Sequence, residues 1–281
     1  MGIGSNEPGM MTIEMAAKAA ISGDKDALNH LVSVLQTDIY GLSFRMLCNR
    51  EDAEDATQEI LIRIVTRLSQ FDFRSKLRTW AYRVAVNYVL DVKKSAVEQM
   101  RLSFEQFAED IISGLFTDAP TEAEKSLLIE EVKIGCTFGM LQCLDREHRL
   151  AYILGEIMEL PGPEAAEILE VSPELFRKRL ELARIAMLRF MKSYCGLVSD
   201  AAPCRCNRQV STALRTGRIN TETFDFAIAP SSFEQTRAIV RQVEEARWTL
   251  QVHRTNNPRP ASIDIARQLL QTLEMGEQDQ Q

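Results

Sequence analysis

The stretch LPGPEAAEILEVSPELFRKRLELARIAMLRFMK (160–192) decides the fold that the sequence predicts. A short helix opened by Pro163 is followed by a tight turn at residues 170–171. A longer helix then begins, with Ser172 as its N-cap and Pro173 at its first helical position. Apolar residues recur along this helix at the spacing of a buried face: Phe176, Leu180, Ala183 and Met187. The segment has the layout of a helix-turn-helix, although a helical hairpin without a DNA function would share its outline.

The opposite face of the longer helix is charged. Its residues are Glu174, Arg177, Lys178, Glu181 and Arg184. Cations near the N-terminal end of a recognition helix lie where the major groove of duplex DNA is read. The pattern therefore indicates duplex binding by this face.

An earlier helix, LRTWAYRVAVNYVLDVKK (77–94), combines aromatic and basic residues. One side of it is apolar and is expected to be buried: Leu77, Ala81, Val84, Ala85, Tyr88 and Val92. A neighbouring strip carries Trp80, Arg83, Asn87, Asp91 and Lys94. Cations neutralise phosphates, an aromatic ring stacks on an unpaired base, and an amide pairs with a base edge. The strip favours a nucleic-acid site, the alternative being a solvated helix face with a buried Trp80.

Charge is segregated along a chain of 281 residues whose formal net charge is −7. Acids dominate EDAEDATQE (51–59) and again FEQFAEDIISGLFTDAPTEAEK (104–125), which is typical of a linker. Helical periodicity runs through nearly the whole chain, while glycine and proline are sparse at 13 and 9 residues. The predicted fold class is all-α.

The order of these segments is an acidic helix, a basic aromatic helix, an acidic linker and a helix-turn-helix. In this order, over residues 16–192, the chain resembles the extracytoplasmic-function sigma factors, the small promoter-recognition subunits of bacterial RNA polymerase. The segment DAEDATQEILIRI (52–64) is similar to the helix by which that family binds polymerase, and residues 77–94 are similar to its promoter-melting helix. The region that begins LQCLDREHRLAYIL (141–154) leads into its helix-turn-helix.

The resemblance implies a set of binding residues for each partner. The implied polymerase-binding residues are Asp55, Gln58 and Glu59. The implied residues for the promoter minus-ten element are Lys76, Arg78, Trp80, Arg83, Asn87 and Lys94. The implied residues for the minus-thirty-five element are Glu174, Arg177, Lys178 and Arg184.

Two stretches depart from the family pattern. The loop FDFRSK (71–76) replaces a sequence close to Phe-Arg-Gly-Glu-Ser-Ser, which leaves the base preference of the melting loop open. LPGPEAAEIL (160–169) replaces the usual start of the helix-turn-helix, so its first helix is free to enter at a different angle.

Four segments are expected along the chain. They are a polymerase-binding and promoter-melting helical domain (1–100), an acidic linker (101–126), a helix-turn-helix domain (127–193) and a C-terminal helical extension (194–281). Some members of the family carry extensions that regulate them in place of a separate anti-sigma factor, so the resemblance implies a regulatory role for this extension. The alternative is a helical cap without a regulatory role.

The extension begins with CGLVSDAAPCRCNRQ (195–209), which contains Cys195, Cys204 and Cys206. Three thiolates would supply most of a tetrahedral zinc site, with His253 as a distant candidate for the fourth ligand. The alternatives are reduced cysteines that serve only packing, or a disulfide formed on oxidation. No cofactor is expected to be required.

The expected partners are core RNA polymerase and promoter DNA, with an anti-sigma factor as a further candidate. One other function is a helix-turn-helix regulator of duplex DNA, although such a protein needs neither the acidic helix nor the Trp80 helix. A second is an enzyme or thiol sensor, but only three histidines occur and no phosphate-binding glycine loop or nucleophile pattern is present. The N-terminus has no signal-peptide pattern and no apolar run approaches the roughly 20 residues of a membrane helix, so a cytoplasmic protein is expected.

Overall fold

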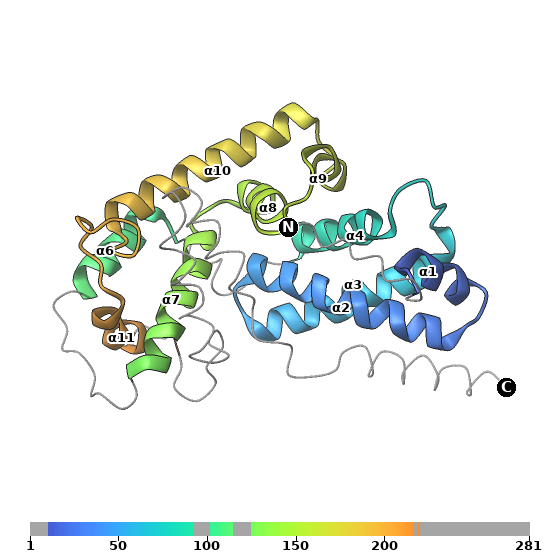
Figure 1. The fold of residues 1–281 in the computed structure, drawn as a ribbon, viewed down its shortest axis with the longest axis horizontal. Coiled ribbons are helices and arrows are strands. Elements are labelled where there is room, and N and C mark those ends of the chain that lie inside the picture. The colour runs from blue at the N-terminus through green and yellow to red at the C-terminus, as the bar shows by residue number, and fades with distance from the viewer. Residues whose placement is uncertain (1–10, 93–101, 115–124, 216–218, 220–281) are drawn as a thin grey trace.

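The structure is a computed structural model, and it describes residues 11–92, 102–114, 125–215 and 219. These residues form ten α-helices, a 3-10 turn and a short π-helix, and the described part of the chain contains no strand. The predicted all-α fold is confirmed. Figure 1 shows two lobes of helices, with one long helix lying across both.

The first lobe contains the helices from the N-terminal half of the chain. They are α1 (Ile13–Ile21), α2 (Lys25–Leu47), α3 (Arg50–Arg67), the 3-10 turn η1 (Leu68–Gln70) and α4 (Leu77–Asp91). Side chains of Thr12, Asp24 and Asn49 accept hydrogen bonds from main-chain N–H groups in the first turns of α1, α2 and α3. These caps satisfy amides that have no partner within the helix, so each helix begins at a position fixed by the local sequence.

The second lobe contains the remaining described helices. They are α6 (Phe104–Gly114), α7 (Lys125–Gln142), α8 (Arg146–Tyr152), the π-helical turn η2 (Ile153–Ile157), α9 (Gly162–Ile168), α10 (Pro173–Tyr194) and α11 (Cys206–Arg215). In Figure 1, α10 runs along the top of the molecule from α6 to α9, and α9 lies above α4.

The helix-turn-helix expected in the second lobe is present as α9 and α10. Ser172 accepts a hydrogen bond of 3.2 Å from the N–H of Leu175, and Pro173 is the first residue of α10. Glu170 adopts φ 53°, the left-handed conformation that turns the chain between the two helices. The apolar residues assigned to the inner face of α10 are all buried: Phe176, Leu180, Ala183 and Met187.

Helix α6 differs from the expectation that residues 101–126 form an acidic linker. Its apolar side chains are buried in the second lobe, where the rings of Phe107 and Phe190 stack with centroids 5.5 Å apart. The amide of Gln209, on α11, donates a hydrogen bond of 2.8 Å to the carbonyl of Ile111. Residues 104–114 are therefore part of a folded lobe that also includes the first helix of the C-terminal extension.

The two lobes meet in two apolar clusters and through a set of polar contacts. Arg149 lies in α8 and donates to the carbonyl of Met46, and Gln142 lies in α7 and donates to the carbonyls of Arg45 and Met46. Arg146 donates to the carbonyls of Leu90 and Val92 at 2.9 and 3.0 Å. The last carbonyls of α2 and α4 are thus capped by side chains of the second lobe, two of which carry the positive charge that a helix C-terminus favours.

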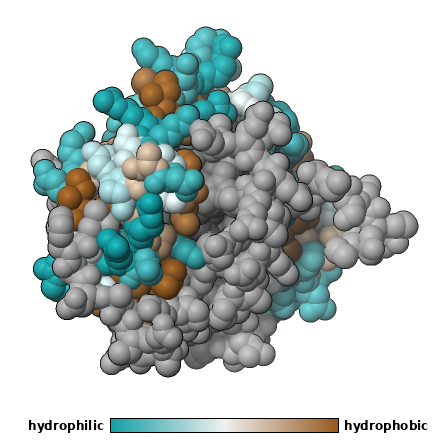
Figure 2. All heavy atoms as spheres, turned by 60° about the vertical axis from the view of Figure 1, so that its left-hand side comes forward, coloured by the Kyte–Doolittle hydropathy of each residue, from teal (hydrophilic) through white to brown (hydrophobic). Residues whose placement is uncertain are grey.

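The described surface is largely hydrophilic on the face shown in Figure 2, with separate apolar spots. Within the ranges that the structure describes, no helix is both long and apolar enough to cross a membrane.

Candidate functional sites

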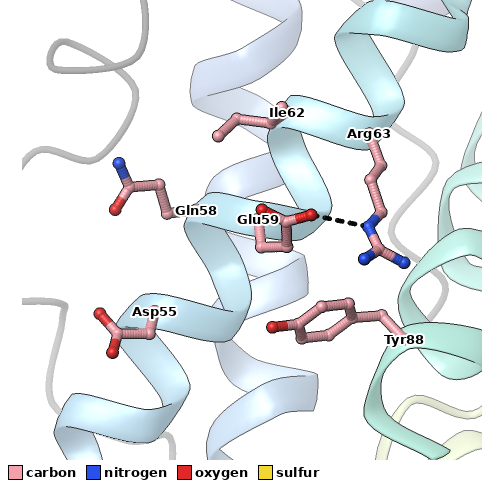
Figure 3. Close-up of a pocket in the computed structure, with 6 residues that line it drawn as sticks. All are labelled: Asp55, Gln58, Glu59, Ile62, Arg63 and Tyr88. Carbon is pink, nitrogen blue, oxygen red and sulfur yellow. Dashed lines mark hydrogen bonds and ion pairs between the residues drawn. The ribbon is translucent and has the colours of Figure 1, made fainter. Parts of the chain in front are cut away.

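An acidic face of α3 lies on the surface of the first lobe. Asp55 and Gln58 are exposed and Glu59 is partly exposed. These three residues line a hollow of about 420 Å³ together with Ile62, Arg63 and Tyr88. Figure 3 shows that Tyr88 reaches across from α4 with its hydroxyl directed toward the acidic side chains of α3. The sequence-predicted polymerase-binding residues therefore share one accessible face.

Arg63 and Tyr88 shape this acidic face, although the sequence did not indicate them as site residues. Arg63 donates a hydrogen bond of 2.9 Å to Glu59, and its guanidinium lies 4.7 Å from the centroid of the Tyr88 ring. Burial raises the pKa of Tyr88, and the nearby carboxylates of Glu59 and Asp55 raise it further while Arg63 lowers it. Helical periodicity placed Tyr88 in the buried stripe, but it is only half-buried and forms one wall of the hollow.

The strip predicted on α4 is only partly exposed. Asn87 and Asp91 are exposed, and Arg83 is half-buried. The ring of Trp80 is partly buried and packs 5.4 Å from the ring of Phe71, measured between centroids. Trp80 therefore has one face in the core, and the described residues of the strip meet solvent mainly at Asn87 and Asp91. The strip's last member, Lys94, lies outside the described residues.

Three cations predicted to contact the minus-ten element are held by carboxylates. Lys76 donates a hydrogen bond of 2.9 Å to Glu164, and Arg83 donates one of 2.9 Å to Glu167. The third contact links Arg78 to Asp38 of α2 at 2.6 Å. The sequence did not indicate these acidic partners, because they lie 40 to 88 residues from the cations in the chain.

The carboxylate that pairs with Arg78 also contacts a buried tyrosine, Tyr82. Burial raises the pKa of Asp38, and the charge of Arg78 and a hydrogen bond from Tyr82 only partly offset the rise. The Tyr82 pKa lies above its ordinary value, first because of burial and then because of the Asp38 carboxylate. Tyr82 is thus a core residue and does not contribute to the exposed strip.

The loop before α4 presents an aromatic ring in an unusual backbone conformation. Phe73 has φ 58°, which a bulky side chain rarely adopts. Its ring lies 4.7 Å from that of Phe71 and 5.1 Å from the amino group of Lys18. The adjacent residues Asp72 and Arg74 form an ion pair. The loop that departs from the family pattern therefore carries an ordered, part-exposed aromatic residue.

The outer face of α10 exposes all four residues predicted for duplex reading, although one of them is also held by a carboxylate. Glu174 and Arg177 are exposed and form an ion pair of 3.4 Å, and Lys178 is exposed beside them. The fourth residue, Arg184, is bonded to Glu156, whose side chain is 2% exposed. Arg184 therefore has a structural partner within the second lobe.

The three cysteines of the extension lie near the end of α10. Cys204 is buried in the core of the second lobe, and Cys195 and Cys206 are partly exposed. Burial raises the pKa of the Cys206 thiol to about 12, and the neighbouring Cys204 and Cys195 add to the rise. The described part of the chain contains no group of three His, Cys, Asp or Glu residues placed to hold a metal. His253 lies outside it, so the zinc site remains a prediction.

Comparisons with known proteins match the first lobe and the overall layout. Residues 31–97 match the family model of sigma-70 region 2. The ECF RNA polymerase sigma factor SigW of Bacillus subtilis (strain 168) is 28% identical over 194 residues, which cover 65% of this chain and 98% of SigW. The ECF RNA polymerase sigma-E factor of Escherichia coli (strain K12) is 29% identical over 182 residues, covering 63% of this chain and 93% of that protein.

A solved structure of CnrH in complex with the cytosolic domain of CnrY is also similar. It has a TM-score of 0.44 and 20% sequence identity, and it covers 61% of this chain and 92% of the CnrH chain.

The described part of the chain combines an acidic helix, a basic aromatic helix and a helix-turn-helix, and the first two lie within the match to sigma-70 region 2. The match to sigma-70 region 2 and the similarity to extracytoplasmic-function sigma factors support a sigma-factor function in transcription initiation. A helix-turn-helix regulator of duplex DNA alone is not favoured, because the sigma-70 region 2 match covers the lobe that such a regulator does not need.

Proposed function

We propose that the chain binds core RNA polymerase through the acidic face of α3, captures the separated strand of the minus-ten element on α4, and reads the minus-thirty-five element with α10. The observation that carries the proposal is the placement of two different surfaces on one lobe. The exposed acids of α3 and the exposed Asn87 of α4 both belong to the part of the chain that matches sigma-70 region 2.

The α3 face suits a protein partner with basic side chains. Asp55 and Gln58 are exposed acceptors, while the Glu59 carboxylate is steadied by Arg63. Ile62 adds an apolar wall to the hollow, so a partner side chain would find both a charge and an apolar contact. Charge complementarity of this kind chiefly speeds association and selects the partner.

The α4 strip suits unpaired bases. A protein that opens DNA without hydrolysing a nucleotide has to offset the unstacking of bases, which costs a few kcal/mol, by binding the exposed bases. Trp80 and Phe73 offer ring faces for stacking, and the Asn87 amide can pair with a base edge. Arg83 and Lys76 supply positive charge for the backbone phosphates.

The α10 surface suits the major groove of duplex DNA. Arg177 and Lys178 are exposed within the first turns of the helix, where recognition helices contact base edges and phosphates. We assign duplex contacts to these two cations and to Glu174, and we give Arg184 a supporting role through its bond to Glu156.

The remaining parts of the proposal follow from this role. The chain acts in the cytoplasm with polymerase and performs no enzymatic reaction of its own. Either a separate anti-sigma factor or the C-terminal extension regulates it. In favour of the extension, α11 is packed directly against α6 and α7 of the helix-turn-helix lobe.

The test is reconstitution with bacterial core polymerase and a promoter library. The wild-type chain is expected to bind core and direct specific initiation, and Asn87→Ala is expected to bind core normally but form fewer open complexes. The matched control is Asn29→Ala, which removes the same side chain from an exposed position on α2. Failure of the wild type to bind core at moderate salt would overturn the proposal, and equal open-complex yields from Asn87→Ala and Asn29→Ala would overturn the role of Asn87.

A further inference from the structure

Three large apolar side chains lie exposed along the outer face of α10. They are Leu175, Leu182 and Ile185, which are 40%, 47% and 54% exposed. Among the helices that the structure describes, α10 carries the largest number of such side chains. Single exposed apolar residues are common on protein surfaces, but several aligned on one helix indicate a binding surface.

The three apolar residues share one side of α10 with two exposed cations. Positions 175, 178, 182, 185 and 189 follow the spacing of a single helix face, in steps of three and four residues. We call this face the α10 strip, and its members are Leu175, Lys178, Leu182, Ile185 and Arg189. It is about 21 Å long, from the rise of an α-helix. The strip combines apolar contacts with positive charge and therefore suits an acidic amphipathic helix.

The α10 strip overlaps the surface that we assign to duplex DNA. Lys178 belongs to both, and the exposed Glu174 and Arg177 lie beside it. The opposite face of α10 is buried in the second lobe, where Phe176 and Met187 are part of the apolar clusters. A helix bound to the strip would therefore approach α10 from the side that DNA needs, and the two ligands would exclude each other.

The chain itself contains a segment that matches the strip. Residues 262–275, SIDIARQLLQTLEM, lie outside the described residues. Their sequence places Ile263, Leu270 and Leu273 at the same i, i+7, i+10 spacing as the three apolar residues of the strip. The pattern predicts an amphipathic helix with an apolar face of matching length.

Charge distinguishes this segment from the other amphipathic stretch of the extension. Residues 262–281 contain four acids and one base, a net charge of −3. Residues 231–254 contain three glutamates and four arginines, so they do not complement the cations of α10. Complementary charge selects the first segment as the partner of the strip.

The length of the chain allows the segment to reach α10. Ile219, the last described residue, lies in an apolar cluster with Leu128 and Val132 of α7. The 42 residues between it and Ser262 span up to about 140 Å when extended, whereas α10 is about 33 Å long. Because the segment is tethered, its effective concentration is in the range of about 1 mM, and a weak intrinsic affinity is sufficient for binding.

We propose that residues 262–275 bind along the α10 strip in the free chain and compete with duplex DNA for α10. The proposal rests on the proposed duplex-reading role of α10. Its consequence is that the end of the extension lowers the affinity of the chain for the minus-thirty-five element until the duplex displaces it.

The test uses the full-length chain and two double variants at positions that do not fill the described core. Leu270→Gln/Leu273→Gln alters the segment, and Leu182→Gln/Ile185→Gln alters the strip. We expect both variants to bind a fluorescent minus-thirty-five duplex about three- to tenfold more tightly than the wild type, since each loses a tethered competitor. Hydroxyl-radical footprinting without DNA is expected to show faster oxidation of Leu175 in both variants.

A peptide and a matched variant serve as controls. A synthetic peptide of residues 262–281 is expected to weaken duplex binding by the segment variant and to leave the strip variant unaffected. Ile21→Gln/Ile112→Gln removes similarly exposed apolar side chains from α1 and α6, and we expect it to keep duplex affinity within about twofold of the wild type.

Equal oxidation of Leu175 in the wild type and the segment variant would overturn the proposal. Weaker duplex binding by the strip variant, with unchanged binding by the segment variant, would also overturn it and would indicate that the strip contacts thymine methyl groups. Protection of Leu175 that depends on protein concentration and persists in the segment variant would overturn it in favour of a second copy of the chain. Protection that the segment variant loses, without duplex binding by any of these proteins, would support the docking and overturn the proposed role of α10.

Discussion

The guanidinium of Arg149 donates a hydrogen bond of 2.5 Å to the main-chain carbonyl of Met46, a residue of the other lobe that lies 103 positions earlier in the chain. Arg149 is 3% exposed and also donates to the carbonyls of Leu141, Gln142 and Leu144. One buried cation therefore ties the end of α2 to the turn between α7 and α8.

Replacement of Arg149 is expected to be strongly destabilising. Arg149→Ala would leave several buried carbonyls without their donor, and each such loss costs about 1–3 kcal/mol. We expect a decrease of about 3 kcal/mol or more in the free energy of unfolding, measured by urea denaturation. Arg146→Ala is the comparison, because this partly exposed side chain caps α4 and is expected to cost only about 1 kcal/mol. Equal losses in the two variants would contradict this reading.

Two cations of α10 are expected to respond differently to replacement. Arg177→Ala is expected to weaken duplex binding for all sequences and reduce the salt dependence of binding by about one counterion, with little change in stability. Arg184→Ala removes a partner of the buried Glu156 and is expected to lower the free energy of unfolding by about 1–3 kcal/mol. Thermal unfolding and salt-dependent binding of a minus-thirty-five duplex distinguish them. If Arg184→Ala lowers duplex affinity and its salt dependence but leaves the free energy of unfolding unchanged, Arg184 contacts DNA directly.

The contact of Glu164, on α9, with Lys76 and Thr79 is expected to weaken in acid. The pKa of Glu164 in the folded chain lies below its ordinary value of 4.5, so its stabilising contribution is present above that value and lost as pH falls through the lowered pKa. The radius of gyration is expected to rise below pH 4.5 while circular dichroism still reports folded helices. Glu164→Gln is expected to flatten this rise. An identical pH profile in the variant would exclude Glu164 as the titrating group.

Zinc content provides a direct test of the cysteine cluster. Protein purified under reducing conditions is expected to contain zinc, and replacement of Cys195, Cys204 and Cys206 by Ser is expected to remove it while leaving polymerase binding intact. Elemental analysis measures the metal. If the wild type contains none and the triple variant transcribes normally across redox conditions, the cysteines serve packing alone.

The sequence predicted the helix-turn-helix well because its signals are local. The N-cap Ser172, the first-turn Pro173 and the 3.6-residue period of the inner face are all contained in one short segment. The acidic composition of residues 104–125 favoured a linker, and it obscured the helical spacing of Phe107, Ala108 and Ile111, which are buried. In that segment, the helical spacing of the apolar residues predicted the structure better than the acidic composition did.

The partners of the α4 cations could not be predicted in the same way. Lys76 and Glu164 are 88 residues apart, and the spacing of charges within either helix says nothing about which helices meet. The half-buried position of Trp80 could not be predicted from the spacing within α4 either, because its inner face is covered by Phe71 from the preceding loop. For the candidate site, the sequence and its family resemblance named residues, and tertiary packing determined which of them are accessible.

The packing of α11 against α6 and α7 determines where the chain can be shortened. Gln209 is 3% exposed and Cys204 is 6% exposed, so both fill space inside the lobe that carries α10. A truncation after Lys192 would remove these side chains, leave the carbonyl of Ile111 without its donor Gln209, and leave Leu128 and Val132 without Val210 in their apolar cluster. Deletions meant to separate regulation from DNA binding therefore need to begin after Ile219, because the smallest unit that keeps this core intact includes α11 and Ile219.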